Sequence, residues 1–299
     1  MKILNIGSLN IDYTYSVEHF VRGGETLATL SREKHCGGKG LNQSIALARA
    51  GAEVYHAGRI GAEGAALVKE LNDSGADTSL ILQHDDATGH AIIQVDPTGQ
   101  NCILIFGGAN QKIGNDDIDG YLSAFSAGDI LLLQNETSGV AYAIEQAAKK
   151  GMYVALNPSP ISKELKSSSA LKYVRWFILN EIEGYELSGE REPERICAVM
   201  QEKYPGSAIV LTLGGDGCLL LDDNGFYRHG AYKVKAIDTT GAGDTFAGYF
   251  LGCTAVGMPV EETLAFASMA AAIAVGRPGA AASIPVMDEV RRALAEIKI

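Results

Sequence analysis

The sequence predicts an α/β fold with a doubly wound, mostly parallel β-sheet. Short continuous apolar runs alternate along the chain with stretches that have a helical period. Such runs, without alternation of polar and apolar residues, are typical of parallel strands that helices bury on both faces. Two stretches, residues 10–36 and 88–108, interrupt this alternation and indicate a separate small β-sheet.

The main elements follow in order along the chain. Residues 2–7 are predicted to form a strand, and residues 40–52 a helix whose apolar positions would face inward. A second helix is predicted over residues 63–72. A third helix is predicted to follow the strand at residues 129–133 and to extend to Lys150. Further buried strands are expected at residues 129–133, 153–156, 176–179, 208–213, 218–221 and 234–237.

The small sheet is predicted from the two interrupting stretches. Residues 10–36 have little helical period, and residues 88–108 contain two β-rich runs joined by the turn sequence Asp-Pro-Thr-Gly. Because both runs of this hairpin are apolar, they require a surface to cover. We therefore expect the two stretches to form a lid that projects from a single domain spanning residues 1–299.

Composition restricts the possible partners. With 46% hydrophobic residues, a chain of 299 residues can bury a full core, and a net charge of −11 argues against nucleic acid as a partner. The five cysteines are scattered without a CxxC pair, which argues against a disulfide framework or a zinc site. Without a signal peptide or a membrane-length apolar run, the protein is expected in the cytoplasm, with no membrane partner.

Polar residues stand directly after several predicted strands. Asn157, Asn180, residues 212–216 and the segment from Asp238 onward all occupy such positions. In open α/β sheets, ligands bind in a crevice outside the carboxyl ends of the strands. These polar residues therefore indicate one ligand crevice.

The segment DTTGAGD, residues 238–244, carries the most specific signal. Gly241 and Gly243 would let the backbone approach a phosphate, with the amides of the following helix start pointing at it. Asp244 in the first helical turn could accept a proton from a substrate hydroxyl, and the helix dipole favours its ionised form. An ordinary helix cap would explain the aspartate but not the two glycines before it.

A second glycine segment, GGKGLN at residues 37–42, opens the first helix. Its free amides could hold an anion or a hydroxyl, with Lys39 and Asn42 adding polar groups. Taken alone, an ordinary strand-to-helix turn explains it better. Asn10 and Asp12 would share one face if extended and could bind vicinal hydroxyls, although a turn is an alternative, and Glu136 is similarly ambiguous.

Two further segments are weak by themselves. Asn180 and Glu183 lie three positions apart, where oxygen ligands could hold Mg²⁺ or its waters, but a solvated first turn is the simpler interpretation. The glycines of TLGGDG, residues 212–217, could let a nucleotide phosphate or base lie close to the backbone. Alternatively, they make a turn into the next strand. GxxxxGK, HExxH and a GxGxxG after the first strand are absent, which excludes a P-loop enzyme and weakens a dinucleotide site.

The order of these pieces resembles that of the ribokinase family, the PfkB-type carbohydrate kinases. The resemblance covers nearly the whole chain, and the DTTGAGD segment is highly specific for it. The matching segments are GSLNID (7–12), GGKGLNQSIALARAGA (37–52), LLLQNE (131–136), ALNPSP (155–160), ILNEIE (178–183), LTLGGDG (211–217) and DTTGAGDTFAGYF (238–250).

This resemblance implies a three-layer αβα sandwich with a projecting β-sheet lid. It implies transfer of the γ-phosphoryl group of ATP to the primary hydroxyl of a sugar, with D-ribose to D-ribose 5-phosphate as the expected reaction. Asp244 would be the base, and Gly241, Ala242 and Gly243 would supply the anion hole. Mg²⁺ would be organised with the help of Glu183.

The resemblance also implies roles for individual residues. The sugar hydroxyls would be bound by Asn10, Asp12, Gly38, Lys39, Asn42, Glu136 and Asp244, and the apolar sugar face covered by Ala91, Ile93 and Ile105. The ATP site would be lined by Asn180, Thr212, Gly214, Gly217, Gly243 and Ser268. A monovalent cation, usually K⁺, would be held by Asp238, Thr240, Ala274, Arg277, Gly279 and Ser283, several through backbone carbonyls.

The chain departs from the family pattern at two places. RGGE, residues 22–25, stands where the family usually has Pro-Gly-Glu, which bears on lid rigidity and sugar choice. Ser268 stands where larger side chains can flank the adenine, which bears on nucleotide preference.

Alternative functions stay open at this stage. The acceptor could be a nucleoside, for which only Phe106 and residues 13–15 offer a platform, or another sugar of the fructose type. A catalytically silent sugar- or nucleotide-binding regulator would be expected to lose Asp244 or the glycines. The exposed lid edges predict a homodimer in which two lids pair.

Overall fold

The computed structural model describes residues 1–297, and within them the strands form two sheets. The large sheet has the order β13-β12-β11-β10-β9-β8-β1-β4-β5 and is parallel except for its last two strands, β12 and β13. Its strands are β1 (Ile3–Ile6), β4 (Val54–Ile60), β5 (Asp77–Gln83), β8 (Ile130–Gln134), β9 (Tyr153–Asn157), β10 (Val174–Asn180), β11 (Ala208–Thr212), β12 (Cys218–Asp222) and β13 (Gly225–His229).

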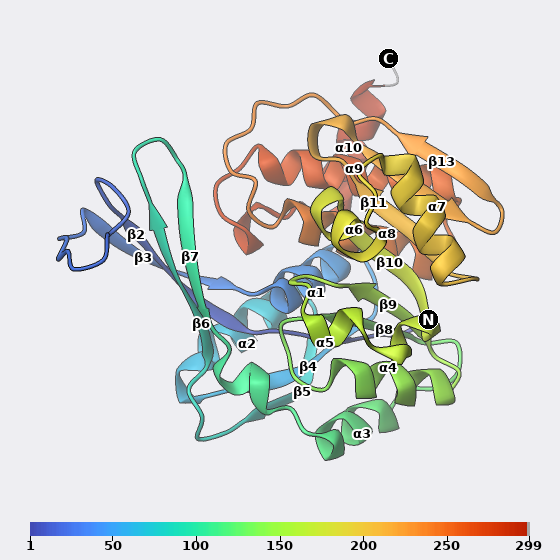
Figure 1. Cartoon of the computed structure of the whole chain (residues 1–299), viewed down its shortest axis with the longest axis horizontal. Coiled ribbons are helices and arrows are strands. Elements are labelled where there is room, and N and C mark those ends of the chain that lie inside the picture. Colours follow the sequence, from blue (N-terminus) through green and yellow to red (C-terminus); the bar gives the residue numbers. More distant parts are fainter. Residues whose placement is uncertain (298–299) are drawn as a thin grey trace.

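Helices cover both faces of the large sheet, which makes the predicted three-layer sandwich (Figure 1). On one side lie α1 (Lys39–Arg49), α2 (Ala65–Asp73), α8 (Ala242–Ala255), α9 (Val260–Val275) and α10 (Met287–Ile297). On the other lie α3 (Asn115–Ser123), α4 (Val140–Lys149), α5 (Lys163–Lys166), α6 (Glu181–Ser188) and α7 (Pro193–Lys203).

Each face of the large sheet has its own hydrophobic core. Successive residues of a strand point to opposite faces, so Ile3 of β1 packs into the core under α1 and α8, while Leu4 packs into the core under α3 and α4. The strands can be continuously apolar because both faces are buried. The fold predicted from the apolar runs is therefore confirmed.

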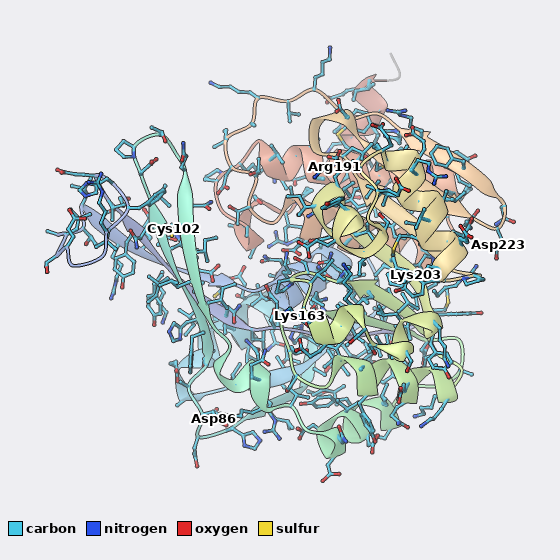
Figure 2. All side chains as sticks on the ribbon, in the orientation of Figure 1. Asp86, Cys102, Lys163, Arg191, Lys203 and Asp223 are labelled. Carbon is cyan, nitrogen blue, oxygen red and sulfur yellow. The ribbon has the colours of Figure 1, made fainter. Side chains whose placement is uncertain are left out.

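The small sheet combines the two stretches that interrupt the alternation. Its order is β3-β2-β6-β7, with β2 and β6 parallel and the outer pairs antiparallel. The strands are β2 (Asn10–Ser16), β3 (Ser31–Gly37), β6 (Gly89–Val95) and β7 (Asn101–Phe106). The sheet projects from the main body (Figure 1), and Cys102 of β7 lies on this projection, away from the helices (Figure 2).

One expected strand is wrong. Residues 234–237 form no strand, and β13 is already complete at His229. Val234 and Ile237 are largely exposed, so their apolar character does not reflect burial in a sheet. Instead, the amides of Ile237 and Asp238 both donate to the carbonyl of Val275 at the end of α9, which fixes this segment over the helix.

No helix within residues 1–297 is long and apolar enough to cross a membrane. All five cysteines are free thiols.

Candidate active site

The carboxyl ends of several parallel strands meet at one crevice, where two cavities adjoin. The smaller, of about 220 Å³, is lined by Asn157, Asn180 and Thr212 at the ends of β9, β10 and β11, together with Lys39 and Asp244. The larger cavity has a volume of about 710 Å³. Both are lined by Thr212, Thr239 and Gly243. The start of α8 therefore lies at the junction of a polar and a more apolar cavity.

Asp244 lines the smaller cavity and is held there by two amide donors. Nδ2 of Asn42 donates to Oδ2 of Asp244 at 3.0 Å, and Nε2 of Gln43 donates to Oδ1 at 2.9 Å. The carboxylate is only 7% exposed, but it lines the smaller cavity. Oδ1 of Asn42 is buried and has no hydrogen-bond partner within residues 1–297. Since buried polar atoms are normally paired, this oxygen indicates a place for a ligand donor.

The start of α8 presents free backbone amides. Gly241 precedes the helix in the left-handed conformation, with φ 73°, which glycine adopts without strain. The Ala242 amide donates to the Thr239 carbonyl at 3.3 Å, whereas those of Gly243 and Asp244 donate to no backbone carbonyl in the described structure. The last two amides, at the positive end of the helix dipole, can receive an anion. The Ala242 amide is already hydrogen-bonded, so it is less available to an anion than the amides of Gly243 and Asp244.

Lys39 and Glu136 link the first helix to the end of β8. Oε2 of Glu136 accepts hydrogen bonds from the Ser8 hydroxyl at 2.5 Å and the Lys39 amide at 3.1 Å. Burial raises the pKa of Glu136 above its usual range. Burial lowers the pKa of Lys39, but the carboxylates of Asp244, Glu136 and Glu183 together raise it above its ordinary value. The Lys39 ammonium is therefore the cation among these three acidic groups.

Asn10 and Asp12 lie on β2, so the extended alternative holds and a turn does not, and both side chains share one face. Oδ1 of Asn10 accepts a hydrogen bond from Nδ2 of Asn110 at 2.8 Å. Burial, with the nearby charge of Glu136, raises the pKa of Asp12 to about 7, although His35 opposes the shift. Asp12 is thus a poorly solvated carboxyl group beside the site.

The two faces of the small sheet differ in chemistry. Asp12 pairs with Ala91, and Ala91 pairs with Ile105, so these side chains share one face, together with Ile93 opposite Thr14. Tyr13, His90 and Phe106 occupy the other face, where the His90 ring contacts both neighbours at 6.2 and 5.1 Å between centroids. The face that carries Asp12 therefore presents aliphatic side chains, and this aromatic cluster points the opposite way.

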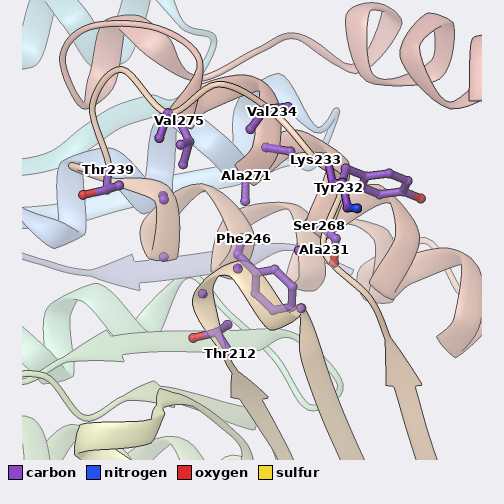
Figure 3. Close-up of a pocket in the computed structure, with 17 residues that line it drawn as sticks. Thr212, Ala231, Tyr232, Lys233, Val234, Thr239, Phe246, Ser268, Ala271 and Val275 are labelled. Carbon is purple, nitrogen blue, oxygen red and sulfur yellow. The ribbon is translucent and has the colours of Figure 1, made fainter.

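The larger cavity collects most of the residues expected at a nucleotide site. Thr212, Gly214, Gly217, Gly243 and Ser268 all line it. Phe246 of α8 and Tyr232 contribute aromatic rings, with Val234, Ala271 and Val275 completing an apolar wall (Figure 3). Oγ of Ser268 lies 3.6 Å from Sγ of Cys218. Because serine is small, this position of the lining takes up little of the cavity.

Asn180 and Glu183 form a capping box at the start of α6. Oδ1 of Asn180 accepts from the Glu183 amide at 2.9 Å, and Oε2 of Glu183 accepts from the Asn180 amide at 3.0 Å. Oε1 of Glu183 is left for other partners, and the residue lines the smaller cavity. Residues 1–297 hold no cluster of three histidine, cysteine or acidic side chains suited to a metal. A lone carboxylate fits Mg²⁺ held mainly by waters and phosphates.

The residues expected around a monovalent cation lie on two adjacent segments. Oδ1 and Oδ2 of Asp238 accept from the amides of Thr240 and Gly279, both at 2.9 Å. The Ala274 carbonyl accepts from the Arg277 amide at 3.0 Å, and the Ser283 hydroxyl donates to the carbonyl of Ala280 at 2.8 Å. Carbonyls and a carboxylate are donors of the hard oxygen type that such cations prefer.

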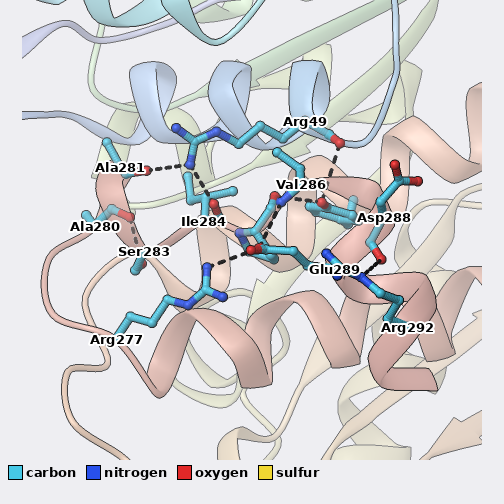
Figure 4. A network of polar contacts seen from close by, with 12 residues as sticks. Arg49, Arg277, Ala280, Ala281, Ser283, Ile284, Val286, Asp288, Glu289 and Arg292 are labelled. Carbon is cyan, nitrogen blue, oxygen red and sulfur yellow. Dashed lines mark hydrogen bonds and ion pairs between the residues drawn. The ribbon is translucent and has the colours of Figure 1, made fainter. Parts of the chain in front are cut away.

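A polar network anchors the segment of residues 274–284 to α1 and α10 (Figure 4). Nη1 of Arg49 donates to the carbonyls of Ala281 at 3.1 Å and Ile284 at 2.5 Å. Arg277 pairs with Glu289 of α10 at 3.2 Å. The first helix, whose other end carries Lys39 and Asn42, is thereby tied to the segment that carries Gly279 and Ser283.

The sequence analysis did not identify the side chains that hydrogen-bond to the predicted site residues. Ser8, Gln43 and Asn110 contact Glu136, Asp244 and Asn10, respectively. Gln43 follows Asn42 directly in the GGKGLN helix, and this adjacency was the one available signal. Asn110 contacts a residue 100 positions away, so no local pattern could identify it.

The fold and the site define a phosphotransferase: a buried carboxylate at a helix N-terminus, free amides beside it, and a large cavity adjoining. The family model of the pfkB family carbohydrate kinases matches residues 1–287. The chain belongs to this family, and its acceptor is a sugar hydroxyl.

Individual relatives cover almost the whole chain. The ribokinase of Haemophilus influenzae is 34% identical over 294 residues, 95% of each chain. The deoxyribokinase of Salmonella typhimurium is 31% identical over 298 residues, 97% of each chain. The solved structure of Arabidopsis thaliana ribokinase complexed with ribose and ATP has a TM-score of 0.85 and 29% identity, and the match covers 98% of each chain.

Proposed function

We propose that the protein is an ATP-dependent kinase of D-ribose, which it converts to D-ribose 5-phosphate. The observation that carries this proposal is the position of Asp244. Its carboxylate lies at the N-terminus of α8 and lines the polar 220 Å³ cavity, and the adjacent Gly243 lines both this cavity and the 710 Å³ cavity. The γ-phosphate of a nucleotide in the larger cavity and the acceptor hydroxyl of a sugar would meet in the smaller cavity, beside this carboxylate. The sugar ring would lie toward Asn42, Glu136 and the small sheet, which line neither cavity. The similarity to a ribokinase solved with ribose and ATP supports the same arrangement.

The reaction follows from the groups at this junction. Asp244 accepts the proton of the primary hydroxyl as the hydroxyl oxygen attacks the γ-phosphorus. The bond between the γ-phosphorus and the bridging oxygen breaks, and ADP leaves. The free amides of Gly243 and Asp244 receive the negative charge of the transferred group. Bound Mg²⁺ would neutralise phosphate charge, and Glu183 would hold one of its waters.

The polar groups of the sugar site favour ribose over 2-deoxyribose. Asn10, Asp12, Lys39, Asn42 and Glu136 would supply the donors and acceptors for the sugar hydroxyls. A site built for hydroxyls discriminates against analogues that lack one, because its buried polar atoms are left unpaired. The unpaired Oδ1 of Asn42 is such an atom.

The small sheet disfavours a nucleoside as acceptor. Tyr13 and Phe106, the aromatic residues expected to support a base, lie on the face opposite Asp12. The face toward the site offers Ala91, Ile93 and Ile105, which suit the smaller apolar face of a sugar. We assign this sheet the role of a lid over the sugar.

A monovalent cation and a homodimer complete the proposal. Asp238 and the segment from Ala274 to Ser283 would hold K⁺ beside the anion hole. The edge strand β7 exposes Ile103, Leu104, Ile105 and Phe106, each by about half its surface or more (48–64%). Because an exposed apolar edge strand is prone to pair, we propose that two lids associate. Light scattering that shows a monomer across concentrations would refute the dimer.

The experiment measures ADP release from ATP and Mg²⁺ with D-ribose, 2-deoxyribose, D-fructose and adenosine in parallel, each with and without K⁺. Turnover that is fastest with ribose and stimulated by K⁺ is expected. Preferred turnover with another acceptor would keep the chemistry and overturn ribose as the substrate. An absence of K⁺ stimulation would overturn the cation site alone.

A further inference from the structure

A chain of buried side chains runs from Asp244 into the core behind the site. Nε2 of Gln43 donates to Asp244 and, at 3.2 Å, to Oδ1 of Asn157. Nε2 of Gln134 donates two hydrogen bonds: to Oε1 of Gln43 at 2.7 Å and to Oδ1 of Asn5 at 3.0 Å. Gln43, Gln134 and Asn5 are all fully buried.

The chain continues from Asn5 to a buried histidine. Nδ2 of Asn5 donates to the Gly40 carbonyl and to the Ser44 hydroxyl, both at 2.8 Å. The Ser44 hydroxyl lies 2.8 Å from Nδ1 of His56 and donates to it in the tautomer whose proton is on Nε2. Burial lowers the pKa of His56 to about 4, so the imidazole is neutral and Nδ1 can accept. The far end of the chain is therefore an acceptor.

Only one orientation of each amide is compatible with these hydrogen bonds. If the amide of Gln43 were reversed, its oxygen would face the carboxylate of Asp244, and its nitrogen would face the donor nitrogen of Gln134. Gln134 cannot reverse either, because its nitrogen already serves the oxygens of both Gln43 and Asn5. Buried donors facing donors are costly, so the chain fixes which end of Gln43 meets Asp244.

We propose that Gln43 is a positioning residue for Asp244, and that Gln134 holds Gln43 in the orientation that presents its N–H groups to the carboxylate. This inference rests on the proposed function, in which Asp244 is the base. Gln43 occupies one oxygen of Asp244 and Asn42 the other, so the carboxylate plane is fixed from two sides. Each oxygen keeps a further lone pair for the acceptor hydroxyl.

The test exchanges the donor for an acceptor with almost no change in shape. In Gln43→Glu, two carboxylates face each other, so we expect kcat to fall about 10- to 100-fold at neutral pH, the range of one charge-assisted hydrogen bond. The acidic limb of the kcat profile should move upward by about one pH unit or more, because like charges raise each other's pKa. Lys39 and Glu136, the other charged groups facing Asp244, are unchanged.

Two companion variants separate positioning from folding. Gln134→Met leaves Oε1 of Gln43 without its donor, so kcat should fall several-fold while the KM values for sugar and ATP stay constant. Gln146→Glu on α4 introduces the same charge at a position that is not part of the buried hydrogen-bond series. This variant should keep the wild-type kcat and pH profile. An unchanged kcat and pH profile in Gln43→Glu would overturn the inference.

A charge exchange provides a readout that needs no substrate. Gln43→Glu alone should lower the melting temperature at neutral pH. Adding Asp244→Asn returns a donor opposite the new carboxylate, so most of this loss should be recovered, although the double variant stays inactive. Failure of the second change to recover any stability would refute the contact. If the wild type phosphorylates no acceptor but the recovery occurs, the proposed function fails and the pairing of positions 43 and 244 stands.

Discussion

Gly37 on β3 lies so close to Asp12 on β2 that a Cβ on Gly37 would fall 1.9 Å from Oδ2 of Asp12. No side chain can occupy that position unless the carboxyl group moves. The conformation of Asp12, and hence its reach into the proposed sugar site, depends on the absence of a side chain at Gly37. The glycine segment at residues 37–42 therefore shapes the site at its first residue as well as at Lys39 and Asn42.

The first prediction concerns this contact. Gly37→Ala should displace Asp12, raising the KM for ribose about tenfold and destabilising the fold by about 1–3 kcal/mol, the usual cost of overpacking. Steady-state kinetics and urea unfolding measure the two effects. Gly120→Ala on α3 is the matched control for KM, because nothing lies within 4 Å of a Cβ there and α3 lines neither cavity. A wild-type KM in Gly37→Ala would show that the position of Asp12 does not matter.

The second prediction concerns the base. Asp244→Asn should lower kcat by about 10²–10⁴-fold with little change in the KM for ATP, because it removes the proton acceptor and leaves the cavity walls in place. Rapid-quench measurement of sugar phosphate formation tests this expectation. Asp116→Asn, which removes a carboxylate from the first turn of α3, controls for the loss of a helix-dipole interaction. Equal activity in the two variants would disprove the role of Asp244.

A third prediction follows from the pKa of Asp12, which burial raises to about 7. Below this pH the group is protonated and loses an acceptor for the sugar hydroxyls. Ribose binding without nucleotide should therefore weaken by up to about tenfold per unit as pH falls below 7. Calorimetric titration across this range measures the dependence. Asp12→Asn should bind more weakly with a flatter profile, and an equally steep profile in that variant would contradict the assignment.

A fourth prediction concerns His56, whose pKa burial lowers to about 4. In the unfolded chain, His56 binds a proton near the ordinary pKa of about 6.5, but in the folded protein its imidazole stays neutral until about pH 4. Stability contributed by the neutral imidazole is thus intact above about 6.5 and is lost progressively as pH falls toward 4, by up to about 3 kcal/mol.

Urea unfolding at a series of pH values tests this loss. His56→Leu should be less stable at neutral pH, since the Ser44 hydroxyl loses its acceptor, but its stability should fall less on acidification. His84→Leu, which changes an exposed histidine, should keep the wild-type slope. Parallel curves for the wild type and His56→Leu would exclude His56 as the source of the acid sensitivity.

Much of the fold follows from local patterns in the sequence. Continuous apolar runs such as residues 129–133 became buried strands because both sheet faces are covered, and the Asp-Pro-Thr-Gly turn became the hairpin between β6 and β7. The run at residues 234–237 was misjudged, because an apolar segment beside a cavity looks the same in sequence as a short buried strand.

The glycines and Asp244 of the DTTGAGD segment are close in sequence, so their spacing alone indicated a helix start with a base beside free amides. The amino-acid sequence thus determined the layered fold and the family, and it predicted a base at Asp244. Only the tertiary structure decided which groups hold that carboxylate and which face of the small sheet carries Asp12 and the aliphatic side chains. The Gln43–Asp244 contact joins positions 201 apart, and Gln134 lies 91 positions from Gln43. Such contacts depend on how strands and helices pack, because no local pattern encodes the orientation of a distant amide.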